Sequence, residues 1–288
     1  MSGTPVLRVG CAMWAHRAWV GRLLPASTPV GGELTPYARL CTAVEGNTTF
    51  YALPDADTVD RWRGAVDADF RFVCKLPREI THDRRLRVDT ATLTPAVERL
   101  AGLGDRLGPI SIQLPPSFGP DDLGALDSFL AAVPADLPWA VEVRHPAFHD
   151  GSAEQRRLDE LLHRTGTDRI IIDTRALFAG PRETPEEIEA FERKPRLTVR
   201  PIATSWQPIV RIIGQRDLEA TEGFWAPWVT KVAEWLGEGR SPIVFLHTPD
   251  NVDAPVLARR FHDAVRRELP ELAPLPEPLP VRDQLELF

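Results

Sequence analysis

Eight short runs of apolar, β-prone residues recur at near-regular intervals, and they constrain the fold more than any other feature of the chain. Their first residues lie 28 to 40 positions apart, which is too far for hairpins but enough for a strand, a loop, a helix and a second loop. Several runs are continuously apolar, as expected for parallel strands buried on both faces. The predicted strands are residues 6–10, 42–45, 70–74, 110–113, 139–143, 169–173, 209–213 and 243–246.

Segments with helical periodicity separate these strands. Apolar residues form one stripe over 123–133 and another over 225–236. A third helix is predicted to begin after Asp253, a residue type that favours the N-terminal cap. Eight strand–helix units within residues 5–268 predict an α/β fold, a single (β/α)8 TIM barrel. A doubly wound sheet is the alternative, but no glycine-rich strand-to-helix fingerprint supports it.

Two segments depart from the strand–helix rhythm. Residues 174–208 are charged and contain prolines, and we expect a long loop with one helix near 186–191. Residues 269–288 contain five prolines and few residues suited to a core. They predict a mobile, extended, proline-rich C-terminal tail outside the barrel.

The composition is typical of a globular protein, with 43% hydrophobic and 26% charged residues in a chain of 288. No apolar run reaches the roughly 18 to 20 residues that span a bilayer, and the first ten residues lack the pattern of a secretory signal. Cys11, Cys41 and Cys74 are widely spaced and predict reduced thiols. We therefore expect a cytoplasmic protein without membrane association. The net charge of −7 argues against a broadly basic, nucleic-acid-coating surface.

Polar residues at the predicted strand ends are the candidate functional residues, because the active site of a TIM barrel lies at the C-terminal ends of its strands. The predicted catalytic residues are three carboxylates, Glu45, Glu142 and Asp173. The predicted substrate-binding residues are Trp14, Asn47, Tyr51, Lys75, His82, Gln113, Arg144, His145, Arg211, His247 and Asp250. The alternation of side chains along a strand puts Glu45 on the same side as Asn47, and Glu142 on the same side as Arg144.

Two interpretations fit this convergence of charges. In the first, the charges neutralise one another in a layer of ion pairs that plugs the barrel. In the second, they line a pocket, because barrel layers are normally filled by Val, Ile and Leu rather than by six charged residues. Three cations predict an anionic substrate with a phosphate or carboxylate. Glu45 and Glu142 would then serve as acid and base, held at different pKa values by their neighbours.

A metal site has weaker support. His82, His145 and His247, together with the three carboxylates, are ligands of suitable type, but they lack a local HExxH-like spacing. Each histidine on its own is more typical of a hydrogen-bonding or capping residue. We assign no metal ligand and no cofactor from the sequence.

Seven strand-end motifs occur in order along the chain: VGCAMW (9–14), VEGNTTFYALP (44–54), FVCKLPREITH (72–82), ISIQLPPSF (110–118), AVEVRHPAF (140–148), VRIIG (210–214) and FLHTPDN (245–251). Together they resemble the YecE-like family, the bacterial "domain of unknown function 72", over nearly all of residues 5–268. The resemblance implies a TIM barrel and implies no established chemistry. The eighth strand here ends in His-Thr-Pro-Asp, where the family usually has a pair of asparagines.

Three classes of function follow from these patterns. The first is an enzyme that hydrolyses a phosphate-bearing substrate, such as damaged or nicked DNA, with Lys75, Arg144 and Arg211 holding the anion. The second is an isomerase or lyase acting on a small anionic sugar or acid. The third is a non-catalytic barrel whose polar mouth binds a ligand or a protein.

The chain ends in the pentapeptide QLELF. It resembles the consensus by which bacterial DNA polymerases and repair proteins bind the sliding clamp, with Gln284, Leu285, Leu287 and Phe288 as the matching residues. Apolar residues at a tethered end suit binding in a partner's pocket. The alternative is an amphipathic stub that packs on the barrel. The motif predicts the sliding clamp as a partner and favours the DNA-linked hypothesis over the sugar hypothesis.

Overall fold

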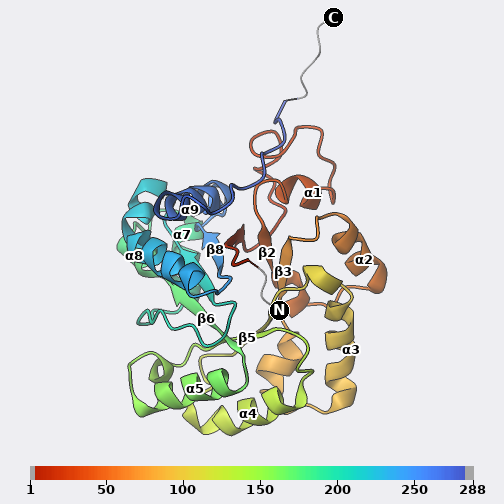
Figure 1. The fold of residues 1–288 in the computed structure, drawn as a ribbon, viewed down its shortest axis with the longest axis vertical. Helices are drawn as coiled ribbons and strands as arrows, with labels where there is room; N and C mark the ends of the chain where they lie inside the picture. The colour runs from red at the N-terminus through yellow and green to blue at the C-terminus, as the bar shows by residue number, and fades with distance from the viewer. Residues whose placement is uncertain (1–3, 283–288) are drawn as a thin grey trace, which may run out of the picture.

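The computed structural model describes residues 4–282, and its centre is a barrel of parallel strands (Figure 1). Their order in the sheet is β3-β2-β1-β8-β7-β6-β5-β4. Neighbours in the sheet are therefore neighbours in the chain, which confirms the (β/α)8 barrel; a doubly wound sheet would reverse this order. The strands are β1 (Arg8–Cys11), β2 (Ala43–Gly46), β3 (Arg71–Cys74), β4 (Ile110–Gln113), β5 (Trp139–Glu142), β6 (Asp168–Asp173), β7 (Ile209–Ile213) and β8 (Ile243–His247).

The barrel closes between β3 and β4 with fewer backbone contacts than elsewhere. Two isolated bridges join the two edges, Phe72 with Leu107 and Lys75 with Ser111. The N–H of Leu76 donates to the carbonyl of Ser111 over 2.9 Å, and that of Gly108 donates to the carbonyl of Phe72 over the same distance. These contacts are sufficient to place the ends of β3 and β4 side by side.

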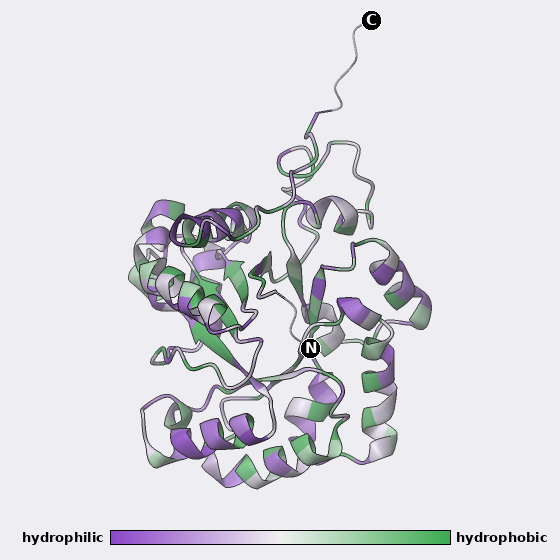
Figure 2. Cartoon of the chain, viewed as in Figure 1, coloured by the Kyte–Doolittle hydropathy of each residue, from purple (hydrophilic) through white to green (hydrophobic). Residues whose placement is uncertain are grey.

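Helices surround the barrel, and their sequences mix polar and apolar residues, whereas the strands are largely hydrophobic (Figure 2). Several helices begin with a side-chain cap; Thr184, for example, forms a capping box with Glu187. No helix within residues 4–282 is long and apolar enough to cross a membrane. The helices are α1 (Leu34–Tyr37), α2 (Ala56–Gly64), α3 (Thr90–Ala101), α4 (Leu123–Ala132), α5 (Ala153–Arg164), α6 (Arg175–Ala179), α7 (Pro185–Arg193), α8 (Leu218–Gly237) and α9 (Ala254–Glu268).

Two expectations about helices are refined by the structure. The helix predicted near 186–191 is α7, but the same segment also contains the short helix α6. Asp253 stands at the N-cap position of α9 without capping it, because its carboxylate instead forms an ion pair with Arg22.

The proline-rich segment after α9 is extended, as expected, but as far as residue 281 it is held against the barrel rather than mobile. The side chain of Leu275 is 8% exposed. The Arg259 guanidinium donates to the carbonyl of Pro276 over 3.0 Å, and the N–H of Ala26 donates to the carbonyl of Val281 over 2.9 Å. Proline composition gives no indication of these tertiary contacts. The QLELF motif lies outside the described residues.

A tightly packed apolar layer fills the interior of the barrel towards the N-terminal ends of its strands. Its members are Ala43, Val73, Ala140, Ile170, Ile209, Ile243 and Phe245. Gly10 of β1 is required by this packing, because a Cβ atom there would lie 2.0 Å from the carbonyl oxygen of Ala43 and 3.3 Å from the Phe245 ring. The layer supports the polar residues at the upper strand ends.

We predict that Phe245→Ala lowers the free energy of unfolding by about 3–5 kcal/mol, because it leaves a cavity in a fully buried layer. Urea denaturation measures this change. The control is Val30→Ala at a fully exposed position, where we expect a change within about 0.5 kcal/mol. A loss below about 1 kcal/mol for Phe245→Ala would show that the layer does not have this packing.

Candidate functional site

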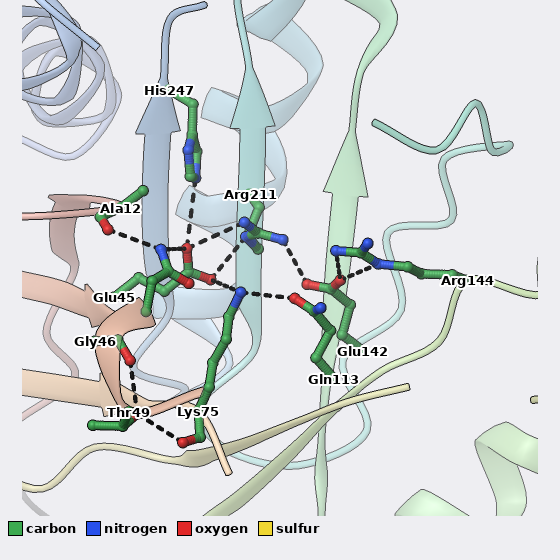
Figure 3. A network of polar contacts seen from close by, with 11 residues as sticks. Ala12, Glu45, Gly46, Thr49, Lys75, Gln113, Glu142, Arg144, Arg211 and His247 are labelled. Carbon is green, nitrogen blue, oxygen red and sulfur yellow. Dashed lines mark hydrogen bonds and ion pairs between the residues drawn. The ribbon is translucent and has the colours of Figure 1, made fainter. Parts of the chain in front are cut away.

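A charged layer lies directly above the apolar layer, because side chains two residues apart on a strand point to the same face. Moving two positions along the chain from Ala43, Val73, Ala140, Ile209 and Phe245 gives the next inward-facing residues. They are Glu45, Lys75, Glu142, Arg211 and His247. These five side chains, each less than 9% exposed, converge with Gln113 at the C-terminal ends of the strands (Figure 3).

Arg211 links the two carboxylates of this layer. Its Nη1 lies 2.6 Å from Glu142 Oε2, and its Nε lies 2.9 Å from Glu45 Oε1 (Figure 3). Arg144 contacts the other oxygen of Glu142, with Nε at 2.7 Å and Nη2 at 2.6 Å. Four strand ends are thus connected by ion pairs, since Lys75 Nζ also lies 3.8 Å from Glu45 Oε1.

Polar neighbours orient these charged groups. Asn47 Nδ2 donates to the carbonyl of Ala12 over 2.8 Å and to Glu45 Oε2 over 3.1 Å. Lys75 Nζ donates to Gln113 Oε1 over 2.7 Å. Thr49 was not among the predicted residues, but its hydroxyl lies within 2.8 Å of the backbone carbonyls of Gly46 and Lys75. It therefore ties the end of β2 to the end of β3.

Both glutamates of the layer are ionised at neutral pH. Burial by itself would raise the pKa of Glu142, but Arg144, Arg211 and Lys75 together hold it well below the usual range. Burial likewise opposes ionisation of Glu45, yet Arg211 and Lys75 outweigh it and lower the pKa. The lowered pKa values of both carboxyls do not support the expectation that one of them acts as an acid near neutral pH.

Lys194 was not predicted from the sequence, and its charge lies within electrostatic range of the site. It directly follows α7, and its N–H donates to the carbonyl of Ala190 over 3.0 Å. Burial lowers the pKa of Lys194 to about 8, with Arg211, Arg144 and Lys75 adding to the shift and Glu45 opposing it. Its ammonium group makes no hydrogen bond or ion pair within residues 4–282. No periodicity in the loop could have indicated that this side chain comes within electrostatic range of the mouth.

His247 is the neutral member of the site. Burial lowers its pKa well below the usual value, and the charges of Arg211, Lys194 and Lys75 lower it further. Its Nε2 lies 4.0 Å from Glu45 Oε2 and has no hydrogen-bond partner in the part of the chain that the structure describes. With His247 neutral, four cationic residues face two carboxylates, so the mouth has an excess of positive charge.

Three predicted residues lie away from this layer. Asp173 is offset by one residue from the inward-facing positions, since its register partner on β7 is Ile212 rather than Arg211. Its carboxylate accepts from Trp228 Nε1 over 2.7 Å and pairs with Arg175. The prediction that Asp173 joins the other carboxylates is wrong for this reason. Trp14 packs edge-on against Trp62 and Phe72, and Tyr51 is 82% exposed.

The remaining predicted residues have local structural roles. His145 Nδ1 accepts from the N–H of Ala147 over 3.2 Å and so caps a short turn, as anticipated for a lone histidine. His82 Nδ1 lies 2.9 Å from Thr81 Oγ1; burial and then the charge of Arg144 lower its pKa. Asp250 accepts from Thr248 Oγ1 over 3.1 Å. Within residues 4–282, no three His, Cys, Asp or Glu side chains come together as metal ligands.

An outer groove of about 680 Å³ between α3 and α4 is a less convincing candidate. It is lined by exposed residues such as Arg87, Asp89 and Thr90 and by apolar ones such as Phe129. No buried polar groups converge on it. The charged barrel mouth has perturbed pKa values and lies where TIM barrels place their active sites, so it is the better candidate.

A barrel with this mouth belongs to a known class of protein. The family model "Protein of unknown function DUF72" matches residues 8–281, and the chain belongs to this family. The chain is 36% identical over 271 residues to the UPF0759 protein YecE of Escherichia coli (strain K12), covering 94% of this chain and 97% of that protein.

Solved structures agree on the fold. A DUF72 family protein from Enterococcus faecalis V583 matches with a TM-score of 0.66 at 18% identity, over 92% of this chain and 98% of that one. A DUF72 family protein from Thermotoga maritima MSB8 matches with a TM-score of 0.65 at 21% identity, over 92% of this chain and all of that one. At this level of identity, the similarity establishes the barrel fold. Any chemistry has to be inferred from the residues of the site itself.

We predict that Glu142→Ala lowers the free energy of unfolding at pH 7 by about 3–5 kcal/mol, because it removes a buried carboxylate from Arg211 and Arg144. Glu154→Ala, which breaks a surface pair with Arg157, is the control and should cost less than about 1 kcal/mol.

Wild type and the Glu142→Ala variant also test the direction of the pKa shift of Glu142. A carboxyl whose folded pKa is depressed stabilises the protein above its unfolded pKa of about 4.3, and this contribution is lost as the pH falls through the folded value. The stability difference between wild type and Glu142→Ala should therefore shrink below about pH 4. A difference that stays constant down to pH 3, by urea denaturation, would contradict the lowered pKa of Glu142.

Proposed function

We propose that the C-terminal mouth of the barrel binds an anionic substrate that carries a phosphate or carboxylate group. One observation carries the proposal. The positive charge at the mouth exceeds the negative charge of the two glutamates, since it is the sum over Lys75, Arg144, Arg211 and Lys194. A bound anion would offset the excess. Partial burial strengthens this attraction relative to the same charges in water.

Arg144 and Lys194 are the cations best placed to meet the anion. Both are only partly buried, whereas Arg211 is enclosed and its donors face Glu45 and Glu142. Nη1 of Arg144 makes no hydrogen bond within residues 4–282, and a guanidinium presents its donors in a plane that matches phosphate or carboxylate. Glu142 holds Arg144 in position through its bonds to Nε and Nη2.

A small anion fits this mouth better than a long stretch of nucleic acid. The chain has a net charge of −7, whereas sequence-independent nucleic-acid binding depends on many phosphate contacts made by basic residues. Phosphate-ester hydrolysis with Glu45 or Glu142 as proton donor has less support, because both carboxyls are ion-paired and have lowered pKa values. The mouth residue best suited to exchange a proton near neutral pH is Lys194.

We predict that Arg144→Ala abolishes sulfate and phosphate binding at pH 7, measured by isothermal titration calorimetry. The fold should lose no more than about 1 kcal/mol, because Glu142 keeps its ion pair with Arg211. Arg157→Ala on the outer helix α5 is the control and should bind like wild type. Unchanged sulfate affinity in Arg144→Ala, or loss of folding in place of loss of binding, would assign these charges a purely structural role.

We also propose that the C-terminal pentapeptide QLELF binds the bacterial sliding clamp. The segment before the pentapeptide supports this proposal. The N–H of Ala26, in the loop that follows β1, donates to the carbonyl of Val281 and so holds the end of that segment. The seven residues after Val281 can then reach no more than about 25 Å from that point. Clamp binding through this tail would therefore hold the barrel near the clamp.

A peptide covering residues 280–288 should bind the sliding clamp with micromolar affinity, in the range of other short docking motifs. Fluorescence polarisation of a labelled peptide measures it. Replacing Leu287 and Phe288 by alanine removes the apolar anchors and should abolish binding. Absence of binding by the unmodified peptide at high micromolar clamp concentration would overturn this proposal while leaving the anion site unaffected.

A further inference from the structure

Tyr51 is an aromatic side chain that is left exposed beside the charged layer. The chain has two tyrosines. Tyr37 is fully buried, and its hydroxyl donates to the carbonyl of Ala43 over 3.0 Å. Tyr51, by contrast, is 82% exposed, and Trp206 is the only other exposed Phe, Tyr or Trp side chain within residues 4–282. Covering an exposed aromatic ring is favourable, so the ring of Tyr51 is suited to contact with a ligand.

The Tyr51 side chain lines a cavity of about 450 Å³. Most of the lining side chains are apolar, and they come from the segment after β2, the segment after β3, and α3. They include Phe50, Leu53, Pro77, Ile80 and Pro95. The rings of Phe50 and Tyr51 meet edge to face with their centroids 5.2 Å apart. A largely apolar cavity of this volume is typical of a small-molecule site.

The charged residues of the cavity do not favour an anion inside it. Arg78 Nη2 lies 3.4 Å from Asp83 Oδ1, and Glu79 adds a second carboxylate to the lining. One cation is thus opposed by two carboxylates. The cavity is therefore suited to the neutral part of a ligand rather than to its anionic part.

The cavity adjoins the charged layer through two shared segments of chain. Thr49 directly precedes Phe50, and its Oγ1 lies 2.7 Å from the carbonyl oxygen of Lys75 (Figure 3). Pro77 follows Lys75 by two residues. The same strand ends that place Lys75 in the mouth therefore also place the side chains that line the cavity.

Arg144 lies within reach of the same small molecule. It follows β5, and β4 alone lies between β5 and β3. Two strand spacings amount to about 10 Å. The His82 ring lies between these features, since its centroid is 5.0 Å from that of Phe50 and the charge of Arg144 contributes to its lowered pKa. An anion at Arg144 and a ring in the cavity can thus belong to one molecule.

We propose that this cavity binds a neutral, planar aromatic ring joined to the anionic group held at the mouth, so that the ligand is a small nucleotide-like molecule. This inference rests on the proposed anion site and names the second part of its ligand. The ring stacks on Tyr51, in one of the offset or edge-to-face arrangements that aromatic pairs prefer. A sugar ring fits less well, because its hydroxyl groups would lose water against Leu53 and Ile80 without gaining hydrogen bonds there.

Isothermal titration calorimetry of the full-length protein at pH 7 tests the inference. The ligands are adenosine 5′-monophosphate (AMP), ribose 5-phosphate, which lacks the aromatic ring, glucose 6-phosphate and inorganic phosphate. We expect AMP to bind about tenfold more tightly than ribose 5-phosphate, because the stacking of one base on an aromatic side chain supplies a factor of this size. Arg144→Ala should abolish the binding of AMP together with that of phosphate.

Tyr51→Ala removes the stacking ring at an exposed position and should reduce the preference for AMP over ribose 5-phosphate to within about twofold. Tyr51→Phe restores the ring and should restore the preference. Trp206→Ala is the matched control, because it removes the other exposed aromatic ring. Trp206 precedes β7 at the opposite end of the barrel, where its carbonyl accepts from the N–H of Ser241 over 2.8 Å. This variant should keep the full preference for AMP.

The aromatic subsite and the anion site can fail separately in this experiment. Equal affinities of wild type for AMP and ribose 5-phosphate, or a preference that survives Tyr51→Ala, would overturn the subsite and leave the anion site standing. Tighter binding of glucose 6-phosphate than of AMP would assign the cavity to a sugar ring and also overturn it. AMP binding that survives Arg144→Ala would show that ring and anion do not bind as parts of one ligand. Failure of wild type to bind any of the four compounds would reject the proposed anion site itself.

Discussion

The barrel at the C-terminal ends of its strands depends on the ion pairs of Arg211. A guanidinium in the interior of β7 is costly unless carboxylates meet it, and Glu45 from β2 and Glu142 from β5 do so at 2.9 and 2.6 Å. These partners lie on strands that are not neighbours of β7 in the sheet. The pairs therefore fix the distance across the mouth as well as compensating the charge.

These ion pairs change how the roles of Glu45 and Glu142 are interpreted. Residues that resemble an acid–base pair in the sequence are held ionised by three cations, and their work is to position Arg144, Arg211 and Lys75. The layer is a set of ion pairs, and under the proposed function it is also a binding surface. The glutamates do not neutralise all of its cations, and the positive excess is displayed at the open end of the barrel.

Membership of the DUF72 family agrees with this view, since the family model spans residues 8–281 and thus includes the segment that follows α9. That segment packs along the barrel through Leu275, Pro276 and Val281. It forms part of the folded body, although its five prolines within residues 269–288 resemble those of a linker. Proline favours an extended backbone in both settings, and only the neighbouring side chains distinguish them.

The sequence alone determined the barrel, because eight apolar runs at near-regular spacing admit few other arrangements, and the two-residue period placed Glu45, Glu142 and Arg211 on the inner face. Tertiary structure decided what local patterns do not encode. One residue of register turned Asp173 outwards to Trp228. The course of an irregular loop brought Lys194 within range of charges on distant strands, which no local pattern encodes. Burial and these charges together lower its pKa.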